Sequence, residues 1–282
     1  MIVAAAAALT GFRIRAQQAG PGPAANAGWV SLFDGSTLDG WDGRSDVWKV
    51  EDGAITGEVA GGPSSVTDTT YIFWKGGEPS DFELKAEIKT EGAFVNSGIV
   101  YRGYVQPALP PGPGRAGAPP LGAADGGNPG SAGAAAGANG GQGAGGRGRG
   151  GGGRGPNNAP YKLAGPQLDF DGANRYAGQY YEIASDRGLL VHRGQIVEAG
   201  DHPEVIGSLG DDGAIRGYIK TGDWNQIRIV ARGNMLIHVI NGHVTSMLID
   251  KDPARFRPKG LLAFQLEGAG KVRIRNIWLK AE

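Results

Sequence analysis

The chain has 282 residues, a formal net charge of zero and no cysteine. The balanced charge provides no global attraction to nucleic acid or to an anionic membrane, and the lack of cysteine excludes disulfides, thiol catalysis and thiolate metal sites. Hydrophobic residues make up 40% of the chain, which suffices for a core, and no segment is apolar over the length that a bilayer requires. Composition therefore predicts a globular protein with neither a transmembrane segment nor a nucleic-acid partner.

The N-terminus has the pattern of a targeting segment. Residues 1–9 form a short apolar run, and small residues continue to Ala16 before Gln17. This resembles the apolar region of a signal peptide with its cleavage zone, although the usual basic residues before it are missing. The missing basic residues mean either that the start codon is mis-assigned or that the segment is not a signal. We predict a signal peptide over residues 1–16, a linker over residues 17–27, and a periplasmic or secreted protein.

The folded unit is predicted to begin at Gly28 and to consist of strands. Asp52-Gly53 and Asn241-Gly242 are strong signals for hairpin turns. Residues 82–89 alternate apolar and charged side chains, which indicates a strand with one face on the core. Further strands are predicted at residues 48–56, 71–74, 96–102, 165–170, 188–193, 224–231, 235–240, 244–249, 260–267 and 272–279.

A low-complexity segment interrupts this pattern. Residues 106–160 contain about twenty of the 52 glycines and almost no apolar bulk, so they cannot bury enough surface to offset the entropy of ordering. We predict a disordered insertion between two strands, which the fold tolerates because loop-closure cost grows slowly with length. Arg147 and Arg149 lie among glycines, but few charges and no interleaved aromatics favour a solvated linker over an RNA-binding segment.

Many short strands separated by Gly, Asp and Asn turns, with no long helical period, predict an all-β fold of two packed sheets, either a sandwich or a jelly roll. A single domain over residues 28–282 accommodates every predicted strand, with the insertion as a loop. The folded part is then about 220 residues, a size that one large all-β domain can reach.

Two predicted strands carry polar residues at alternate positions. Asn96 and Arg102 have the same parity on one strand, and Gln167 and Asp169 share a face of the other. Gln265 and Glu267 have the same parity on a late strand and lie either on this face or at its edge. A sheet face with these side chains is too polar for a core, so we predict the floor of a site for a hydroxyl-rich ligand.

The order of several short motifs resembles a known family. The motifs are Leu32-Phe33-Asp34-Gly35, Leu38-Asp39-Gly40-Trp41, Trp48-Lys49-Val50-Glu51-Asp52-Gly53, Asn96-Ser97-Gly98-Ile99 with Tyr101-Arg102, Trp224-Asn225, Ile240-Asn241-Gly242 and Arg275-Asn276-Ile277. Together they resemble the bacterial 3-keto-disaccharide hydrolase family over residues 28–281, apart from the insertion. The resemblance implies a concanavalin-like or LamG-like jelly roll, usually exported, that cleaves glycosides whose sugar carries a ketone at C3.

That reaction needs a specific set of groups. A C3 ketone acidifies the C2 proton, so a base can remove it, the C1 substituent leaves by β-elimination, and water then adds. We predict Asp169 or Glu182 as the base, Arg102 as the group that stabilises the enolate or holds hydroxyls, and His192 as the acid. The alternatives are a structural ion pair of Asp169 with Arg102, a solvated charge at Glu182 and a surface histidine at His192.

The remaining site residues are predicted to bind the sugar. Asn96 and Gln167 would orient it, Tyr101 and Tyr181 would stack on the ring, and Gln265 and Glu267 would join them if they face the same side. The four histidines show no zinc spacing. A divalent metal, Ca²⁺ or a transition metal held by His192 and a carboxylate, stays open as a cofactor.

Two classes of function fit this pattern. The first is an exported enzyme that cleaves 3-keto-glycosides or 3-keto-disaccharides. The second is a non-catalytic carbohydrate-binding or surface-interaction sandwich. Both predict a carbohydrate ligand and the same polar face, and they differ in whether a carboxylate on that face lies within reach of an abstractable proton.

Overall fold

The computed structural model describes residues 28–60, 69–106, 153–154 and 160–282. The predicted signal peptide and linker lie outside the described residues, as does most of the insertion over residues 106–160. The exceptions within that insertion are Gln106, Pro160 and the two residues of a short strand, Gly153–Arg154. No helix among the described residues has the length and apolar character needed to cross a membrane.

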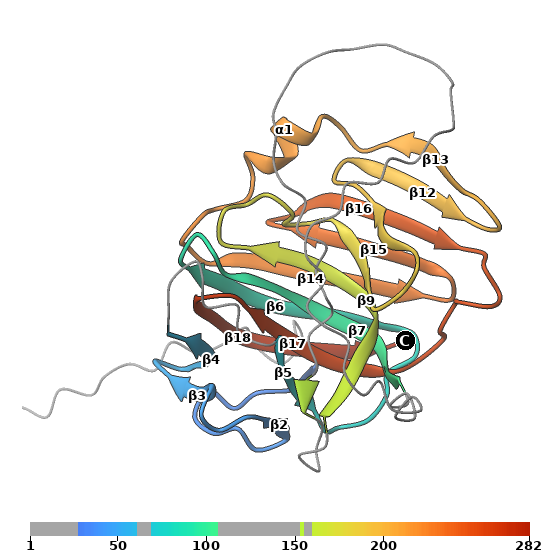
Figure 1. Ribbon diagram of the computed structural model, residues 1–282. Helices are drawn as coiled ribbons and strands as arrows, with labels where there is room; N and C mark the ends of the chain where they lie inside the picture. The colour runs from blue at the N-terminus through green and yellow to red at the C-terminus, as the bar shows by residue number, and fades with distance from the viewer. Residues whose placement is uncertain (1–27, 61–68, 107–152, 155–159) are drawn as a thin grey trace, which may run out of the picture.

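The described chain forms two sheets and one short helix, α1 (Asp212–Arg216) (Figure 1). The ten-stranded sheet has the order β13 (Pro203–Ser208), β12 (Gln195–Ala199), β16 (His243–Asp250), β15 (Met235–Ile240), β14 (Asn225–Arg232), β6 (Phe82–Glu91), β18 (Gly270–Ala281), β4 (Ala54–Val59) and β3 (Trp48–Glu51), with β1 (Val30–Ser31) also paired to β18. The eight-stranded sheet has the order β11 (Gly188–Val191), β10 (Tyr180–Ile183), β9 (Pro160–Asp171), β7 (Asn96–Gln106), β17 (Leu261–Glu267), β5 (Thr70–Trp74) and β2 (Trp41–Gly43), with β8 (Gly153–Arg154) paired to β9.

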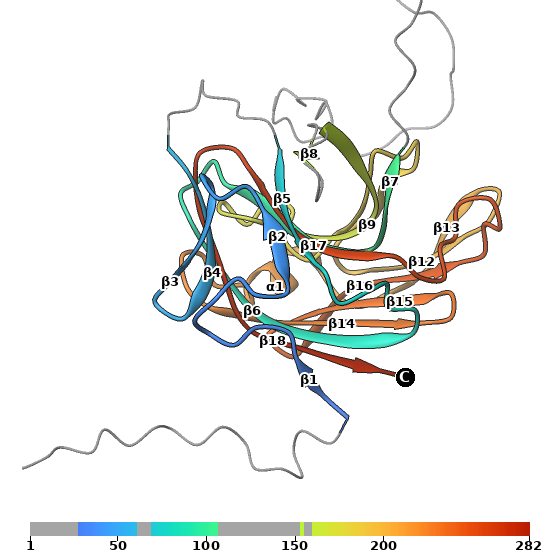
Figure 2. The same ribbon diagram turned by 90° about the horizontal axis from the view of Figure 1, so that it is seen from below.

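The two sheets lie face to face as the layers of a sandwich, which Figure 2 shows from below. Phe82, Leu84 and Ile88 of β6 are fully buried, and they join a core that includes Ile99 of β7 and Phe264 of β17 from the other sheet. The predicted alternation on β6 is thus confirmed, because its charged residues point to the other side. The fold is the all-β, two-sheet jelly-roll sandwich that the sequence predicts.

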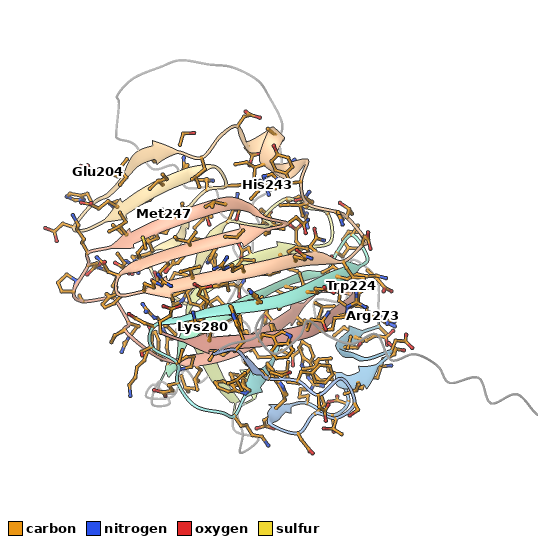
Figure 3. All side chains as sticks on the ribbon, turned by 180° about the vertical axis from the view of Figure 1, so that it is seen from behind. Glu204, Trp224, His243, Met247, Arg273 and Lys280 are labelled. Atoms are coloured by element: carbon orange, nitrogen blue, oxygen red, sulfur yellow. The ribbon has the colours of Figure 1, made fainter. Side chains whose placement is uncertain are left out.

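Figure 3 shows the outer side of the ten-stranded sheet, where charged side chains gather over β6 and β18 and apolar ones such as Met247 lie over β15 and β16. Arg273 pairs with Glu51 at 3.1 Å and with Glu91 at 3.2 Å, and the guanidinium of Arg275 lies 3.9 Å from the ring centroid of Trp224. These ion pairs and this cation–π contact lie on the solvent side of the ten-stranded sheet. The buried polar side chains that could form a site lie on the eight-stranded sheet.

Both predicted hairpin turns are present. Asp52 and Gly53 have φ of 50° and 73°, and Asn241 and Gly242 have φ of 50° and 83°, as a type I′ turn requires at both central positions. These turns connect β3 to β4 and β15 to β16. Asn and Asp tolerate this left-handed backbone better than other side-chain-bearing residues, which is why the dipeptides are such strong signals.

Several strands differ from the predicted ones. Sequence patterns do not indicate β12 and β13, since β13 is exposed along nearly its whole length and has no core-facing alternation. β9 begins at Pro160 rather than Gly165, and β8 forms within the segment predicted to be disordered, where Gly153 pairs with Tyr161. Short strands without an apolar face are stabilised by pairing to a neighbour, and this leaves no periodic signal.

We predict that Gly57→Ala destabilises the sandwich. A Cβ at Gly57 would lie 2.7 Å from the ring of Trp48, and that rigid side chain is 1% exposed. We expect the free energy of unfolding to fall by about 1–3 kcal/mol, measured by urea denaturation.

Gly200→Ala is the control, because a Cβ there meets nothing within 4 Å and the backbone does not need glycine. We expect no loss, or a gain of a few tenths of a kcal/mol. Equal effects of the two substitutions would contradict the packing argument.

Candidate functional site

The alternation of side chains on the eight-stranded sheet separates a core face from an outer face, the one that points away from the ten-stranded sheet. Ile99 of β7, Leu168 of β9 and Leu266 of β17 belong to the core. Their neighbours Gly98, Gln167, Asp169, Gln265 and Glu267 must therefore point outward. The question of whether Gln265 and Glu267 lie on this face or at its edge is thereby answered, because both point to the same side as Asp169.

Strand pairing brings these residues together. Asn96 lies opposite Glu267 on one neighbouring strand, and Gly98 lies between Asp169 on β9 and Gln265 on β17. Asn96 Nδ2 donates to Glu267 Oε2 at 3.1 Å, and Gln167 Nε2 donates to Asp169 Oδ1 at 2.6 Å. We call this group the polar cluster: Asn96, Gln167, Asp169, Gln265 and Glu267, together with Tyr71 and Tyr181.

The strand that carries Asp169 ends in a loop held by its neighbour Asp171. Asp171 Oδ1 accepts from the backbone N–H of Tyr176 at 2.8 Å and of Ala177 at 3.2 Å. The N–H of Gly178 then donates to the carbonyl of Asp169 at 2.8 Å. The Asp169-x-Asp171-Gly172 sequence is thus explained by loop formation, in the way that Asp residues commonly organise turns.

The carboxyl of Asp169 has the strongest electrostatic perturbation in the cluster. Burial raises its pKa from 3.8 to about 8, the nearby charges of Asp171 and Glu267 add to this rise, and the hydrogen bond from Gln167 opposes it. Desolvation and neighbouring like charges both disfavour a carboxylate. At neutral pH this group is therefore mostly protonated, and it is a much stronger base when ionised than an exposed Asp.

Two tyrosine hydroxyls border the carboxyls. Burial raises the pKa of Tyr71, with a further rise from the charge of Glu267. Burial also raises the pKa of Tyr181, and the charges of Asp169 and Glu267 act in the same direction. Both hydroxyls therefore stay protonated at neutral pH and serve as hydrogen-bond donors. The nearby amide of Gln265 opposes the rise in the pKa of Tyr71. Tyr181 is only half-buried, so its hydroxyl is the more accessible donor.

An apolar patch continues the outer face beyond the polar cluster. Tyr71 and Tyr181 lie at the boundary, and they belong both to the polar cluster and to this apolar patch. The other members are Phe73, Val100, Leu163, Ile183, Ala184, Leu261 and Ala263. The face is thus divided into a polar half around Asp169 and an apolar half, as is common for pockets that orient a ligand with a few polar groups.

Arg102 does not lie on the outer face, which corrects the prediction that it shares a side with Asn96. The pairing of β7 with β9 shifts by one residue between Val100 and Tyr104, and Arg102 has φ of 47° within this bulge. Its guanidinium is completely buried and donates to the carbonyls of Ser80 at 2.9 Å and Gly233 at 2.7 Å. A bulge reverses the direction of later side chains, and the sequence pattern does not indicate it.

The predicted ion pair between Arg102 and Asp169 is also absent from the described contacts. Arg102 instead pairs with Asp81 at 2.9 Å, and the same carboxylate accepts from the N–H of Gly233 at 3.0 Å. Arg102 therefore links β7 to the ends of β6 and β14, so its position supports a structural function.

Tyr101 lies in the core rather than on the sugar-facing side. Its hydroxyl is 2.7 Å from Nε2 of His238, a histidine that stacks on Tyr180. Burial lowers the pKa of His238 to about 3, so the imidazole is neutral. His238 is therefore a packing residue of the core, and of the two tyrosines predicted to stack on the sugar only Tyr181 lies on the outer face.

Glu182 points into the sandwich as well, because it has the parity of Tyr180 rather than Tyr181. Its carboxylate lies 2.5 Å from Nε of Arg187, which also pairs with Asp250 at 2.8 Å. Burial raises the pKa of Glu182, while the contacts with Arg187 lower it. Neither the predicted base nor the predicted solvated charge describes Glu182, which belongs to a buried ion triad.

His192 is exposed in the turn after β11. Its backbone N–H donates to Gln195 at 3.2 Å, and the described hydrogen bonds include none between its imidazole and Asp169. No group of three or more His, Asp or Glu side chains among the described residues is arranged to hold a metal ion. The divalent metal stays a prediction without an assigned ligand set.

Two members of the site escape sequence analysis. Tyr71 belongs to a short aromatic strand whose exposed and buried positions cannot be distinguished without knowing its neighbours. Gly98 stands out only when its partner strands are known, because the side chain of Gln167 occupies the space where its Cβ would lie. The sequence offers one indication of its position: Gly98 lies two residues after Asn96, so both are on the same face of the strand.

The fold and the polar cluster together define a jelly-roll sandwich with a polar and aromatic outer face. The chain belongs to the family of 3-keto-α-glucoside-1,2-lyase-like domains, whose sequence pattern it matches over residues 28–280. This confirms the family that the motifs predict, and it supports a carbohydrate-active role. Among curated proteins none matches the sequence.

Solved structures with a similar outline are distant in sequence. A "putative glycosyl hydrolase" from Parabacteroides distasonis is 17% identical, with 91% of this chain and 94% of that chain covered and a TM-score of 0.47. The carbohydrate-binding module CBM66 from Bacillus subtilis is 9% identical, with 86% and 96% covered and a TM-score of 0.41. A Bacillus subtilis protein of unknown function with a galectin-like fold is 10% identical, with 92% and 91% covered and a TM-score of 0.44. At these scores the likenesses carry no functional argument.

We predict that Asp169→Asn makes the protein more stable, and more so at pH 9 than at pH 5. The carboxyl ionises near 3.8 in the unfolded chain but at about 8 in the folded one, so every pH unit between these values favours the unfolded state. The neutral amide removes this cost. Melting temperatures of both proteins at the two pH values test it, and an equal gain at both would show that Asp169 titrates normally.

We predict that Arg102→Leu lowers the free energy of unfolding by about 2–4 kcal/mol, because it leaves buried carbonyls of Ser80 and Gly233 without a donor. Lys259→Ala is the control, since Lys259 forms an exposed pair with Glu78 and such pairs contribute little. Urea denaturation measures both, and similar losses would contradict the structural function of Arg102.

Proposed function

We propose that this protein is an enzyme that cleaves 3-keto-glycosides, with Asp169 as the base that removes the proton from C2 of the sugar. The observation that carries the proposal is the Asp169 carboxyl on the outer face, with its pKa raised to about 8 and two tyrosine hydroxyls nearby. A general base works best when its pKa lies near the working pH, and perturbed carboxyls gather at functional sites.

The proposed reaction proceeds by elimination. The Asp169 carboxylate takes the C2 proton, the electron pair forms the C1–C2 double bond through an enolate at the C3 ketone, and the C1–O bond breaks. The leaving oxygen takes a proton, and water then adds across the double bond, so that the net result is hydrolysis. The half-buried Tyr181 hydroxyl is a suitable donor to a developing oxyanion, because burial, with the nearby carboxyls, raises its pKa and keeps it protonated.

The family description supports this reaction, since it names a 1,2-lyase of 3-keto-α-glucosides. The neutral donors in the cluster support it as well. Asn96, Gln167 and Gln265 present amide groups around Asp169, and amides and tyrosines are suited to a ligand with many hydroxyls. We further propose that the enzyme acts after export, which cell fractionation with an antibody would test.

The first experiment incubates purified protein with 3-keto-trehalose in D₂O, with and without chelator. We expect release of the leaving sugar and a deuteron at C2 of the keto product, because the abstracted proton exchanges with solvent. Trehalose without the ketone should stay intact, whereas an ordinary glycosidase with two carboxylates would cleave it. Loss of turnover with chelator would show that a metal takes part.

Asp169→Asn and Glu182→Gln distinguish the two predicted bases. We expect Asp169→Asn to lower kcat/KM by about 10²–10⁴-fold. Glu182→Gln should retain turnover at a temperature where it is folded, because Glu182 lies inside the sandwich with Arg187. Wild-type turnover in Asp169→Asn would remove Asp169 from the mechanism. Binding of keto-sugars without cleavage would favour a carbohydrate-binding sandwich.

A further inference from the structure

Gln167 and Asp169 form a buried hydrogen bond on the outer face of the eight-stranded sheet. The two residues are two positions apart on β9, so they share a face, and Gln167 Nε2 donates to Asp169 Oδ1 at 2.6 Å. Gln167 is 2% exposed and Asp169 is 8% exposed. The amide oxygen of Gln167 is buried without a hydrogen-bond partner among the described residues, an arrangement that costs free energy and needs a compensating reason.

The neighbouring strand leaves room for this contact. Gly98 lies opposite Asp169, and a Cβ built on it would lie 2.6 Å from Cδ and 2.7 Å from Nε2 of Gln167. The backbone of Gly98 is ordinary strand, because its φ lies outside the left-handed region. The position therefore needs glycine for space alone, and the amide of Gln167 fills that space.

The two carboxyl oxygens of Asp169 differ as a result. Oδ1 accepts the Gln167 hydrogen bond, whereas Oδ2 accepts none from any described residue. Asp169 is 8% exposed, and Oδ2 is the carboxyl oxygen that this hydrogen bond leaves available for a proton. A proton on the carboxyl must sit on Oδ2 as long as the amide N–H points at Oδ1.

We propose that Gln167 is a positioning residue, which holds Oδ1 of Asp169 as an acceptor so that Oδ2 exchanges the proton with the substrate, and that Gly98 makes this arrangement sterically feasible. Gln167 touches neither leaving group nor ketone in this scheme. Its effect on the reaction passes through the orientation and proton affinity of Asp169.

The other groups that face Asp169 act by charge and not by hydrogen bonding. Asp171 on the same strand and Glu267 on β17 raise its pKa, whereas Gln167 is the one described residue whose hydrogen bond lowers it. Tyr181 on β10 and Tyr71 on β5 are neutral at working pH because burial raises their pKa values. Removal of the Gln167 donor therefore leaves only influences that disfavour the carboxylate.

The test measures the proton affinity of Asp169 directly. Full-length protein labelled with ¹³Cγ-aspartate is titrated by NMR, and the signal missing in Asp169→Asn identifies the carboxyl. We expect Gln167→Leu to raise its pKa by about one to two units, the equivalent of a hydrogen bond to a charged group. Gly98→Ala should shift it in the same direction, because the added methyl displaces the amide while the donor is still present.

Gly103→Ala is the matched control on the same strand. A Cβ there would lie 3.1 Å from Val100 Cγ1 and 3.3 Å from Leu163 Cδ1, so it crowds the apolar half of the outer face and not the carboxyl. We expect the Asp169 titration to stay unchanged in this variant. An unchanged pKa in folded Gly98→Ala or Gln167→Leu, or an equal shift in Gly103→Ala, would overturn the proposal.

This inference deepens the proposed function and rests on it for its catalytic meaning, but the titration needs no substrate. If wild type cleaves 3-keto-trehalose, the acid limb of the kcat/KM profile should move to higher pH in Gln167→Leu by the same amount as the NMR pKa. If wild type cleaves nothing, the NMR shifts still decide whether Gln167 controls the carboxyl, so the two failures are distinguishable.

Discussion

Register between β7 and its two neighbours is the constraint on which the rest of the site depends. Side chains alternate across a strand, so a slip of one residue would move every polar group of the outer face into the core. The buried residues Ile99, Leu168 and Leu266 prevent this slip by filling the space between the sheets. The same packing that stabilises the sandwich thereby aligns Gly98 with Asp169 and Gln265. Formation of the core and assembly of the polar cluster are one event.

Burial gives the outer face its chemical character. Carboxyls, amides and tyrosines lie together there, and the described hydrogen bonds and ion pairs of Asp169 include no cation that would neutralise it. Cations in the same chain, Arg102 and Arg187, point toward the other sheet and neutralise carboxylates there. Glu182 and Asp250 are thus paired with Arg187 inside the sandwich, whereas burial raises the pKa of the Asp169 carboxyl on the outer side to about 8.

The sequence predicts the architecture well and the site in part. Type I′ dipeptides and the alternation of β6 locate hairpins and a core face, because local backbone preference and burial produce periodic signals. Gln167 and Asp169 follow from the same reasoning, and their face is correctly identified as polar. Arg102, Tyr101 and Glu182 are placed wrongly, since a one-residue bulge and the parity of β10 decide their direction. Neither the bulge in β7 nor the parity of β10 can be predicted from the sequence pattern. The need for glycine at position 98 is evident only once the side chain of Gln167 is placed next to it.

The bulge at Arg102 divides β7 into two segments with different registers toward β9. On one side lie the pairs that align Asn96 and Gly98 with the Asp169 strand, and on the other lies the route to Gln106, after which the chain returns at Pro160. The buried guanidinium of Arg102 anchors the boundary to the second sheet. The alignment of Gly98 with Asp169 is therefore set by the pairs on the first side of the bulge, and the pairs on the second side keep a separate register.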